Sequence, residues 1–336
     1  MPVIDIHAHY VSPDLIGEAA RNGAKYGVKL QDDPTGKQRL VIADTAPLRP
    51  VFPELCDLTL RLPMLKAHSI DLQIISTWTD LAGDELARAE AARWSRLQNE
   101  TLADAARAMS GRFEVMGTLP MQHPDLAIAE LEYIVRRLDI RSVEIGTNIN
   151  GRDLDHQEFR AVWKRLAELD VFVLLHPPRV PVGMERANDY FLNNLISYPT
   201  DTTIAAARLM FSGILKDYPT LKCCLAHGGG FLPYQIGRFD RGFAAHPACK
   251  IGISQPPSKY LRSFLYDTLT HNTEALGYLI GLVGSDKILF GSDYPFEMVD
   301  EAGPARVREV DRLTAAEQEA ILGGNADLLF GRKPVA

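Results

Sequence analysis

The sequence predicts an α/β protein with the (β/α)₈ or TIM-barrel fold and a small β-hairpin insertion near the amino end. Short apolar runs alternate with helical segments eight times along the 336 residues. These runs are continuously apolar, which is typical of parallel strands covered on both faces. Eight such units fit a closed barrel better than an open sheet, and no glycine fingerprint of a dinucleotide fold follows the first run.

The composition and charge of the chain argue against several classes of function. The chain is 46% hydrophobic and 24% charged, without repeats or linkers, so we expect one domain over residues 1–336. A net charge of -7 without a basic stripe argues against a nucleic-acid partner. Neither a membrane-spanning run nor a signal peptide is expected. Four cysteines without a disulfide pattern favour a reducing cytoplasm.

The amino-terminal part contains the first strand and the insertion. Residues 3–9 read as a short buried strand, and Ser12 with Pro13 predicts the capped start of a helix. Two apolar-leaning runs flank the turn signal at 32–36, so residues 25–52 are expected to carry a β-hairpin. The leucines of residues 57–68 suggest a short helix.

From residue 71 onward the alternation becomes regular. A capping box at Thr314 and Glu317 predicts the start of the final helix. The expected strands are 71–77, 113–118, 142–146, 171–176, 222–227, 264–268 and 287–293. The expected helices are 83–109, as one helix or two, then 124–138, 155–169, 201–215, one after the glycines at 228–230, and 273–283.

Histidines and one aspartate end several of these strands. A barrel builds its active site at the carboxyl ends of the strands. His7 and His9 end the first strand, His176 the fifth, His227 the sixth and Asp293 the eighth. Residues two apart in a strand share a face, so the first two imidazoles should project together. Three imidazoles and a carboxylate suit Zn²⁺ with a water, and Fe²⁺ or Mn²⁺ would also be accepted.

The remaining histidines are expected to be solvated or packed in loops. His271 is the exception, because it lies just past the seventh strand and could reach the same rim. A single histidine at the end of an apolar strand is more often a core residue than a ligand. Four of them with Asp293, all on one predicted rim, reverse that expectation.

The ordered motifs resemble the amidohydrolase superfamily. They are HAH at 7–9, HP at 176–177, AHGGG at 226–230 and GSDYPF at 291–296. Within that superfamily they are most similar to the metal-dependent decarboxylases of the aminocarboxymuconate-semialdehyde type. The similarity runs from the first strand to the Gly-Asn-Ala at 324–326. It implies a (β/α)₈ barrel with a small β insertion near the amino end.

The resemblance also implies residue roles. His7, His9, His176 and Asp293 match the metal ligands, and His227 matches a proton-transfer group beside the metal-bound water. No lysine follows the fourth strand, so one metal ion is expected rather than two. Gamma-resorcylate-type decarboxylases typically carry glutamate at position 7, so the histidine favours the aminocarboxymuconate type.

Substrate-binding residues follow from the same resemblance. Arg49 matches an arginine that holds a substrate carboxylate, and Arg238 one that reaches the active site of a neighbouring subunit, which implies at least a homodimer. Guanidinium groups suit such bidentate contacts. Tyr190 stands at a substrate-lining tryptophan position. Arg179 departs from the Pro-Trp-Asp pattern after the strand-five histidine and could add an anion-binding group.

The function expected from these residues is non-oxidative decarboxylation of an unsaturated or aromatic carboxylic acid. The substrate would be a small carboxylic acid, and the cofactor one divalent metal ion, with Zn²⁺ favoured. A metal-dependent hydrolase or hydratase acting on a carboxylate-bearing substrate uses the same groups and remains open. A third possibility is a non-enzymatic barrel that only binds a ligand or a partner. The complete set of metal-ligand candidates together with His227 argues against it.

Overall fold

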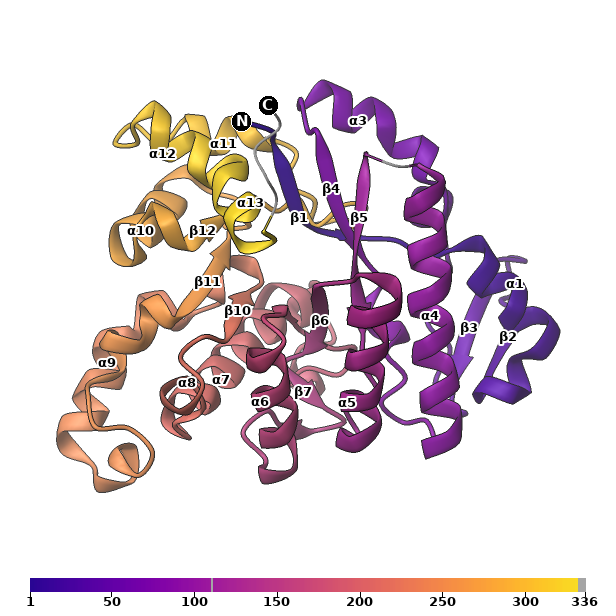
Figure 1. Ribbon diagram of the computed structural model, residues 1–336, viewed down its shortest axis with the longest axis horizontal. Coiled ribbons are helices and arrows are strands. Elements are labelled where there is room, and N and C mark those ends of the chain that lie inside the picture. Colours follow the sequence, from indigo (N-terminus) through magenta and orange to yellow (C-terminus); the bar gives the residue numbers. More distant parts are fainter. Residues whose placement is uncertain (110, 332–336) are drawn as a thin grey trace.

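The protein is a barrel of eight parallel strands wrapped by helices, which confirms the predicted fold. The computed structural model describes residues 1–109 and 111–331. The strand order in the sheet is β1-β4-β5-β6-β9-β10-β11-β12, and Figure 1 shows the helices on its outside. The strands are β1 (Ile4–His9), β4 (Leu72–Ser76), β5 (Phe113–Thr118), β6 (Ser142–Gly146), β9 (Phe172–His176), β10 (Lys222–Leu225), β11 (Phe264–Asp267) and β12 (Ile288–Leu289).

Strand β1 and the chain that follows β12 close the barrel. The backbone N–H of Ile6 donates to the carbonyl of Phe290 at 2.9 Å. Gly291 lies at this seam, where a Cβ atom would come within 2.9 Å of the Cβ of His7. Glycine therefore allows the two segments to approach as closely as the closed barrel requires.

Helices follow the strands around the barrel. Figure 1 shows α4, α5 and α6 side by side along one flank. The α-helices are α1 (Pro13–Asn22), α2 (Pro53–Cys56), α3 (Leu62–Ala67), α4 (Arg88–Ala108), α5 (Pro124–Tyr133), α6 (Arg160–Glu168), α7 (Tyr198–Phe211), α8 (Ile214–Asp217), α9 (Leu232–Ala245), α10 (Thr273–Val283), α11 (Pro304–Arg308), α12 (Ala315–Glu319) and α13 (Asn325–Leu329).

Element types were predicted better than element ends. Helix α10 coincides with the predicted span 273–283. Helix α4 is continuous but begins at Arg88, because Gly83 adopts φ 76° and residues 83–87 form a turn. Strand β12 has only two residues, whereas the sequence suggested 287–293, because the chain leaves the ladder before Asp293.

Two predicted helix starts are confirmed in their hydrogen bonds. The hydroxyl of Ser12 accepts from the backbone N–H of Asp14 at 3.2 Å. The Thr314 hydroxyl accepts from the N–H of Glu317 at 3.3 Å, while the Glu317 carboxylate accepts from the N–H of Thr314 at 2.9 Å. Both caps satisfy backbone N–H donors that have no partner within the first helical turn.

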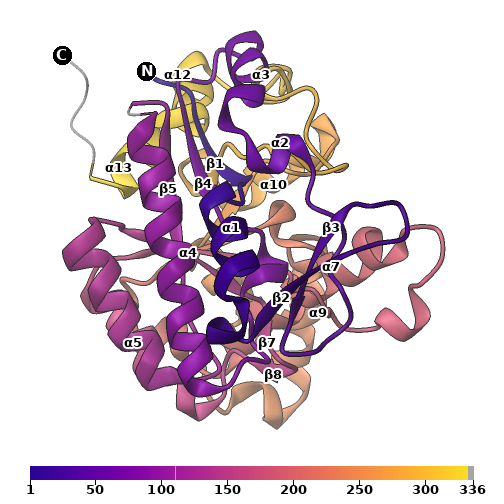
Figure 2. The same ribbon diagram turned by 90° about the vertical axis from the view of Figure 1, so that its right-hand side faces the viewer.

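The amino-terminal hairpin is present inside the predicted insertion. Strands β2 (Val28–Asp32) and β3 (Gln38–Ile42) are antiparallel, and Figure 2 shows them near α1. Their buried residues pack in one cluster with Tyr26 and Trp94. A short second pair, β7 (Asn148–Ile149) and β8 (Arg152–Asp153), follows β6. The assignment of residues 1–336 to a single domain stays a prediction.

The sheet is buried on both faces, as its continuously apolar strands suggested. One cluster, which includes Ile4, Leu72, Phe172 and Leu174, joins side chains from strands around the barrel. A larger cluster lies between strands and helices and contains Trp163. In the part of the chain that the structure describes, no helix has both the length and the apolar character needed to cross a lipid bilayer.

A buried polar network ties β1 and β4 to the helical layer. The Arg61 side chain is fully buried and donates to the Gln73 side chain and to the carbonyl of His9, both at 2.9 Å. The Gln73 amide then donates to the carboxyl of Asp5 at 2.7 Å, and the Ser292 hydroxyl donates to the same carboxyl at 2.5 Å. Asp5 in β1 thus joins both sides of the barrel seam, and Arg61 from outside the sheet supports it through Gln73.

Replacement of Arg61 by methionine is expected to lower the free energy of unfolding by about 3 kcal/mol, because buried acceptors lose their donors. Urea denaturation followed by circular dichroism measures the change. The control is Arg107→Met, because Arg107 is 60% exposed in its surface ion pair and should shift stability by no more than about 0.5 kcal/mol. Equal effects of the two substitutions would contradict the structural role of Arg61.

Candidate metal centre

A β-bulge in β1 sets the direction of its histidines. Ile4 pairs with Leu72 and Ala8 with Ile75, so β1 uses one more residue than β4 between these pairs. His9 consequently pairs with Ser76, which shares a strand face with Leu72. The bulge therefore brings His9 to the face that Ile4 occupies near the amino end, which is the face lining the barrel interior.

Five side chains converge at the carboxyl end of the barrel. The Nε2 atoms of His7 and His9 lie 3.5 and 3.2 Å from Oδ1 of Asp293, and Nε2 of His227 lies 3.6 Å from its Oδ2. The imidazole rings of His9 and His176 are 5.0 Å apart. Nε2 of His7, His9 and His176 and Oδ1 of Asp293 are buried without a hydrogen-bond partner among the described residues.

Hydrogen bonds on the far side of each ring fix which nitrogen faces the centre. Nδ1 of His7 lies 2.9 Å from the carboxylate of Asp267, and Nδ1 of His176 lies 2.9 Å from the carbonyl oxygen of Pro177. Carboxylate and carbonyl oxygens only accept, so both Nδ1 atoms carry the proton. In the neutral form of these two rings, the Nε2 lone pairs therefore point into the cluster.

His9 is anchored through a hydroxyl. Its Nδ1 lies 3.2 Å from the hydroxyl of Ser76, which donates its own proton to Glu144 at 2.5 Å. The hydroxyl oxygen is therefore left to accept from Nδ1 of His9. Glu144 also accepts from the hydroxyl of Thr79, which lies 2.9 Å from Nδ1 of His176. One carboxylate thus supports two rings of the cluster.

The two residues farthest along the chain are placed by special backbone conformations. His227 and Asp293 have φ of 55° and 59°, in the left-handed region that side chains seldom adopt. Gly230 makes the first of these turns possible, because a Cβ there would approach the carbonyl oxygen of Pro199 to 2.2 Å. The glycines after His227 therefore let its loop pack against the start of α7.

Burial and neighbouring charges set the ionisation of the cluster. Burial, reinforced by the nearby imidazoles of His9 and His7, lowers the pKa of His176, which keeps this ring neutral. Burial opposes ionisation of Asp293, but the adjacent imidazoles of His227, His9 and His7 outweigh it and hold the pKa of its carboxyl well below the usual range. A neutral imidazole and an ionised carboxylate are the forms that bind a metal ion.

The donor set fits one divalent metal ion. One potential ligand atom from each of His7, His176, His227 and Asp293 lies within 4.8 Å of the others. His9 adds a further buried Nε2 without a partner. A buried cluster of imidazole lone pairs around a carboxylate has no hydrogen-bond donors of its own at its centre, and a cation satisfies all of these acceptors together.

A cavity of about 350 Å³ opens onto this cluster. Arg49 lines it, paired with Glu297 at 3.0 Å, with its guanidinium 4.3 Å from the ring centre of Phe296. Asp80 and Tyr198 also line it. Burial raises the pKa of Asp80 to about 6, against the opposing effect of the nearby arginines. The cavity thus joins a candidate metal centre to groups that bind anions.

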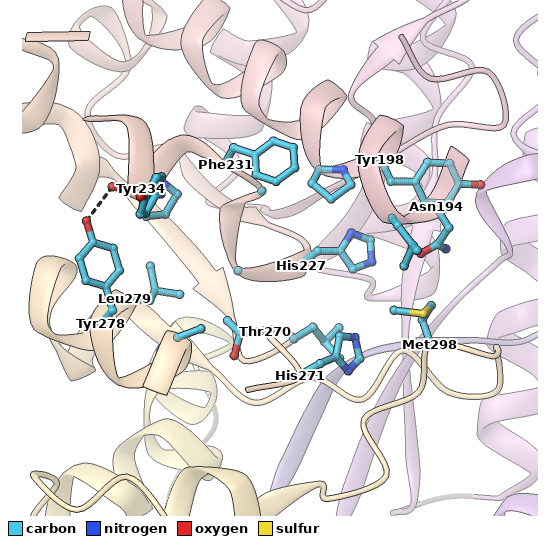
Figure 3. A pocket seen from close by; sticks show the side chains of 17 residues that line it. Asn194, Tyr198, His227, Phe231, Tyr234, Thr270, His271, Tyr278, Leu279 and Met298 are labelled. Carbon is cyan, nitrogen blue, oxygen red and sulfur yellow. Dashed lines mark hydrogen bonds between the residues drawn. The ribbon is translucent and has the colours of Figure 1, made fainter. Parts of the chain in front are cut away.

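A second, more apolar cavity of about 490 Å³ lies next to the first. Figure 3 shows His227 between its aromatic side, with Tyr234 and Tyr278, and the side where Tyr198 and Met298 lie. His227, Tyr198 and Met298 line both cavities. His271, which the sequence placed near the rim, lines only this second cavity among the described ones. His227 therefore faces both spaces.

The structure brings most predicted site residues together, but not all. His7, His9, His176, His227 and Asp293 form the cluster, and Arg49 lines the first cavity, as described above. Arg238 is exposed on α9 and does not line the cavity of its own chain. Tyr190 is 87% exposed and does not line that cavity, whereas its neighbour Phe191 does.

Two carboxylates that support the cluster were missed at the sequence level. Asp267 is the last residue of β11, and Glu144 lies in β6 two residues before its end. The rule that identified Asp293 at a strand end applies equally to Asp267, so the signal was available. The role of Glu144 could not be predicted from the sequence, because it depends on the hydroxyls of Ser76 and Thr79, which lie between its carboxylate and the histidines.

Asp267→Asn is expected to weaken Zn²⁺ binding about tenfold to a hundredfold, because His7 loses the carboxylate that orients its ring. Competition with a chromophoric chelator measures the dissociation constant. Asp286→Asn is the matched control, since Asp286 forms a surface ion pair with Arg262 and should leave Zn²⁺ affinity unchanged. Wild-type affinity in Asp267→Asn would show that this carboxylate does not orient the ligand.

Asp80 is expected to make anion binding depend on pH. Its carboxyl is neutral below a pKa of about 6 and charged above it, so a rise in pH adds a negative charge beside Arg49. The affinity of the metal-loaded protein for benzoate, measured by calorimetry, should therefore fall between about pH 5 and about pH 7. This decrease in affinity should be smaller in Asp80→Asn than in the wild type. In the surface variant Asp104→Asn it should equal that of the wild type. The same slope in all three proteins would rule out Asp80 as its source.

Comparison with known proteins agrees with the geometry. The amidohydrolase family model matches residues 4–332. The chain is 30% identical to the 2-amino-3-carboxymuconate-6-semialdehyde decarboxylase of Dictyostelium discoideum, over 98% of this chain and 92% of that protein. It is also 30% identical to the gamma-resorcylate decarboxylase of a Polaromonas strain, over 80% of this chain and 86% of that protein.

A solved structure supports the fold independently. The crystal structure of 5-carboxyvanillate decarboxylase from Sphingomonas paucimobilis superposes with a TM-score of 0.82 at 22% identity, covering 99% of both chains. At that identity the likeness concerns the fold. With the family model, the two curated relatives and the strand-end cluster taken together, this chain belongs to the amidohydrolase family and resembles its metal-dependent decarboxylases.

Proposed function

We propose that the protein is a metal-dependent, non-oxidative decarboxylase of an unsaturated or aromatic carboxylic acid. The observation that carries the proposal is the convergence of unpartnered Nε2 atoms around Asp293, directly beside a cavity lined by Arg49. A metal centre next to an anion-binding wall suits a carboxylate substrate. The relatives at 30% identity are decarboxylases of such acids, which supports this reaction class.

The proposed cofactor is one divalent metal ion held by His7, His9, His176 and Asp293. Imidazole and carboxylate donors suit Zn²⁺, and Mn²⁺ or Fe²⁺ would also fit. When bound, such an ion supplies Lewis-acid stabilisation of negative charge on a substrate oxygen. No lysine ends β6, so this position does not match the lysine that bridges two metals in other amidohydrolases.

In the proposed reaction, residues of the chain bind the substrate and transfer the proton. Arg49 binds the substrate carboxylate and aligns the bond to the departing CO₂ with the neighbouring π system. His227, with the ionised Asp293 beside it, manages the proton that goes to the substrate carbon, and the bond to the carboxylate then breaks with release of CO₂. Nε2 of His227 lies 3.6 Å from Oδ2 of Asp293, and both residues line the same cavity.

The proposal extends to the assembly and the location. Arg238 reaches the cavity of a neighbouring subunit in a homodimer, which agrees with its exposed place on α9 and its absence from its own cavity. Tyr190 is proposed to contact substrate, although this requires its exposed ring to be covered. All four cysteines are free, which is consistent with a cytoplasmic protein.

Removal of the metal is expected to abolish CO₂ release, and Zn²⁺ or Mn²⁺ should restore it. The assay follows CO₂ from muconate-like and hydroxybenzoate-like acids with chelated, then reconstituted, protein, and metal content is measured in parallel. Chelation followed by dilution without metal is the control. Uptake of water by an amide, lactone or alkene without CO₂ would instead indicate a hydrolase or hydratase. CO₂ release undiminished in metal-free protein would contradict the proposal.

A further inference from the structure

Buried polar atoms without a partner occur at a second place, outside the metal centre. Among the described residues, the hydroxyl oxygen of Ser95, both amide atoms of Gln98 and Oε1 of Gln122 are buried and form no hydrogen bond. Ser95 and Gln98 are three residues apart in α4 and share one face of this helix. Gln98 is only 1% exposed, and a buried amide without partners is unfavourable. This amide therefore needs a hydrogen-bonding ligand.

Gln98 lines a small cavity near the metal ligands. The cavity has a volume of about 20 Å³ and lies where β4, β5 and β6 end. A water molecule needs about 10–15 Å³, so the cavity has room for one. Asp84, Thr118 and Glu144 line it together with Gln98, and their side chains offer hydroxyl and carboxyl oxygens. The size and polarity of the cavity fit a single water molecule.

The position of Gln98 is fixed by the residue that follows it. The Asn99 side chain donates to the carbonyl oxygen of Thr118 at 3.0 Å and accepts from the backbone N–H of Thr118 at 2.8 Å. These two bonds hold α4 against the end of β5, where Thr118 lines the cavity. The amide of Gln98 is thereby kept at the cavity wall before any ligand binds.

Glu144 connects this cavity to the metal ligands. Its carboxylate accepts from the hydroxyls of Ser76 and Thr79 at 2.5 and 2.6 Å. These hydroxyl oxygens lie 3.2 Å from Nδ1 of His9 and 2.9 Å from Nδ1 of His176, respectively. An ionised carboxylate has about four acceptor sites, so about two remain for further donors. A group that holds this carboxylate in place therefore also supports the two rings.

We propose that Gln98 binds a buried water molecule that also donates to Glu144, so that Gln98 is a positioning residue for the metal ligands. This inference rests on the metal centre of the proposed function and is independent of the substrate. Water suits the site better than a cation does, because the amide nitrogen of Gln98 presents N–H donors. The water accepts from this nitrogen and donates to the carboxylate, which satisfies groups of both residues.

Zinc affinity tests the positioning role. Gln98→Met removes the amide but keeps a side chain of similar length, so the water loses its partner on α4. The dissociation constant for Zn²⁺, from competition with a fluorescent chelator, should rise about threefold to tenfold, which is the effect of one lost hydrogen bond. Gln157→Met is the matched control, because Gln157 is exposed just before α6 and should leave the constant unchanged. Wild-type Zn²⁺ affinity in Gln98→Met, with or without a change in its urea midpoint, overturns the inference.

Crystal structures test the water directly, even if the variant folds poorly. In the wild type, one solvent peak should lie about 2.7–3.2 Å from both the Gln98 amide and the Glu144 carboxylate. The peak should be missing in Gln98→Met. A wild-type cavity without ordered solvent, or a water that contacts only one of the two residues, contradicts the inference. An anomalous signal at this peak after exchange into Rb⁺ would identify a cation and would also overturn it.

Failure of the proposed metal centre has a different signature. Wild type and His9→Ala would then bind Zn²⁺ with the same weak affinity. The solvent peak between Gln98 and Glu144 would still be read from wild-type crystals, so the two failures are told apart.

Discussion

The site depends on hydrogen bonds made behind the histidines. Each ring of His7, His9 and His176 has its Nδ1 held by an oxygen outside the cluster, which fixes the tautomer and aims Nε2 inward. Without these bonds the rings could rotate or present protons, and the centre would hold donors and acceptors together. Asp267 also accepts from the backbone N–H of His227 at 2.9 Å, so one buried carboxylate orients a ring and places the loop of the proton-transfer candidate.

The barrel supplies the rigidity that these bonds require. Its seam lies between β1 and the segment that carries Asp293, so any opening there would separate the two ends of the cluster. The close approach at Gly291 and the network from Arg61 through Gln73 to Asp5 oppose such an opening. Residues outside the barrel wall therefore contribute to the geometry inside it, and the fold and the site share one set of constraints.

We expect the side chains that line the cavity above the cluster to determine which substrate binds. The two arginines differ in their state: Arg49 is paired and packed on aromatic rings, while Arg179 donates to the hydroxyl of Thr45. Asp80 in the same cavity wall has a raised pKa, which makes the charge of this wall sensitive to pH. In the proposed function the metal centre would set the class of reaction, and these three side chains line the wall that an acid would meet.

The sequence by itself determined the barrel, the hairpin insertion and the rim on which His7, His9, His176, His227 and Asp293 meet, because apolar periodicity and strand ends are local signals. Only the tertiary structure decided which groups support them. The β1 bulge, the short β12 and the link from Glu144 through Ser76 to His9 depend on pairings between strands that lie far apart in the chain. The structure also left Tyr190 exposed and Phe191 in the cavity wall, since left-handed conformations at both residues turn that loop in a way that residue type does not show. Local pattern fixes which element a residue belongs to, whereas packing between elements decides what its side chain touches.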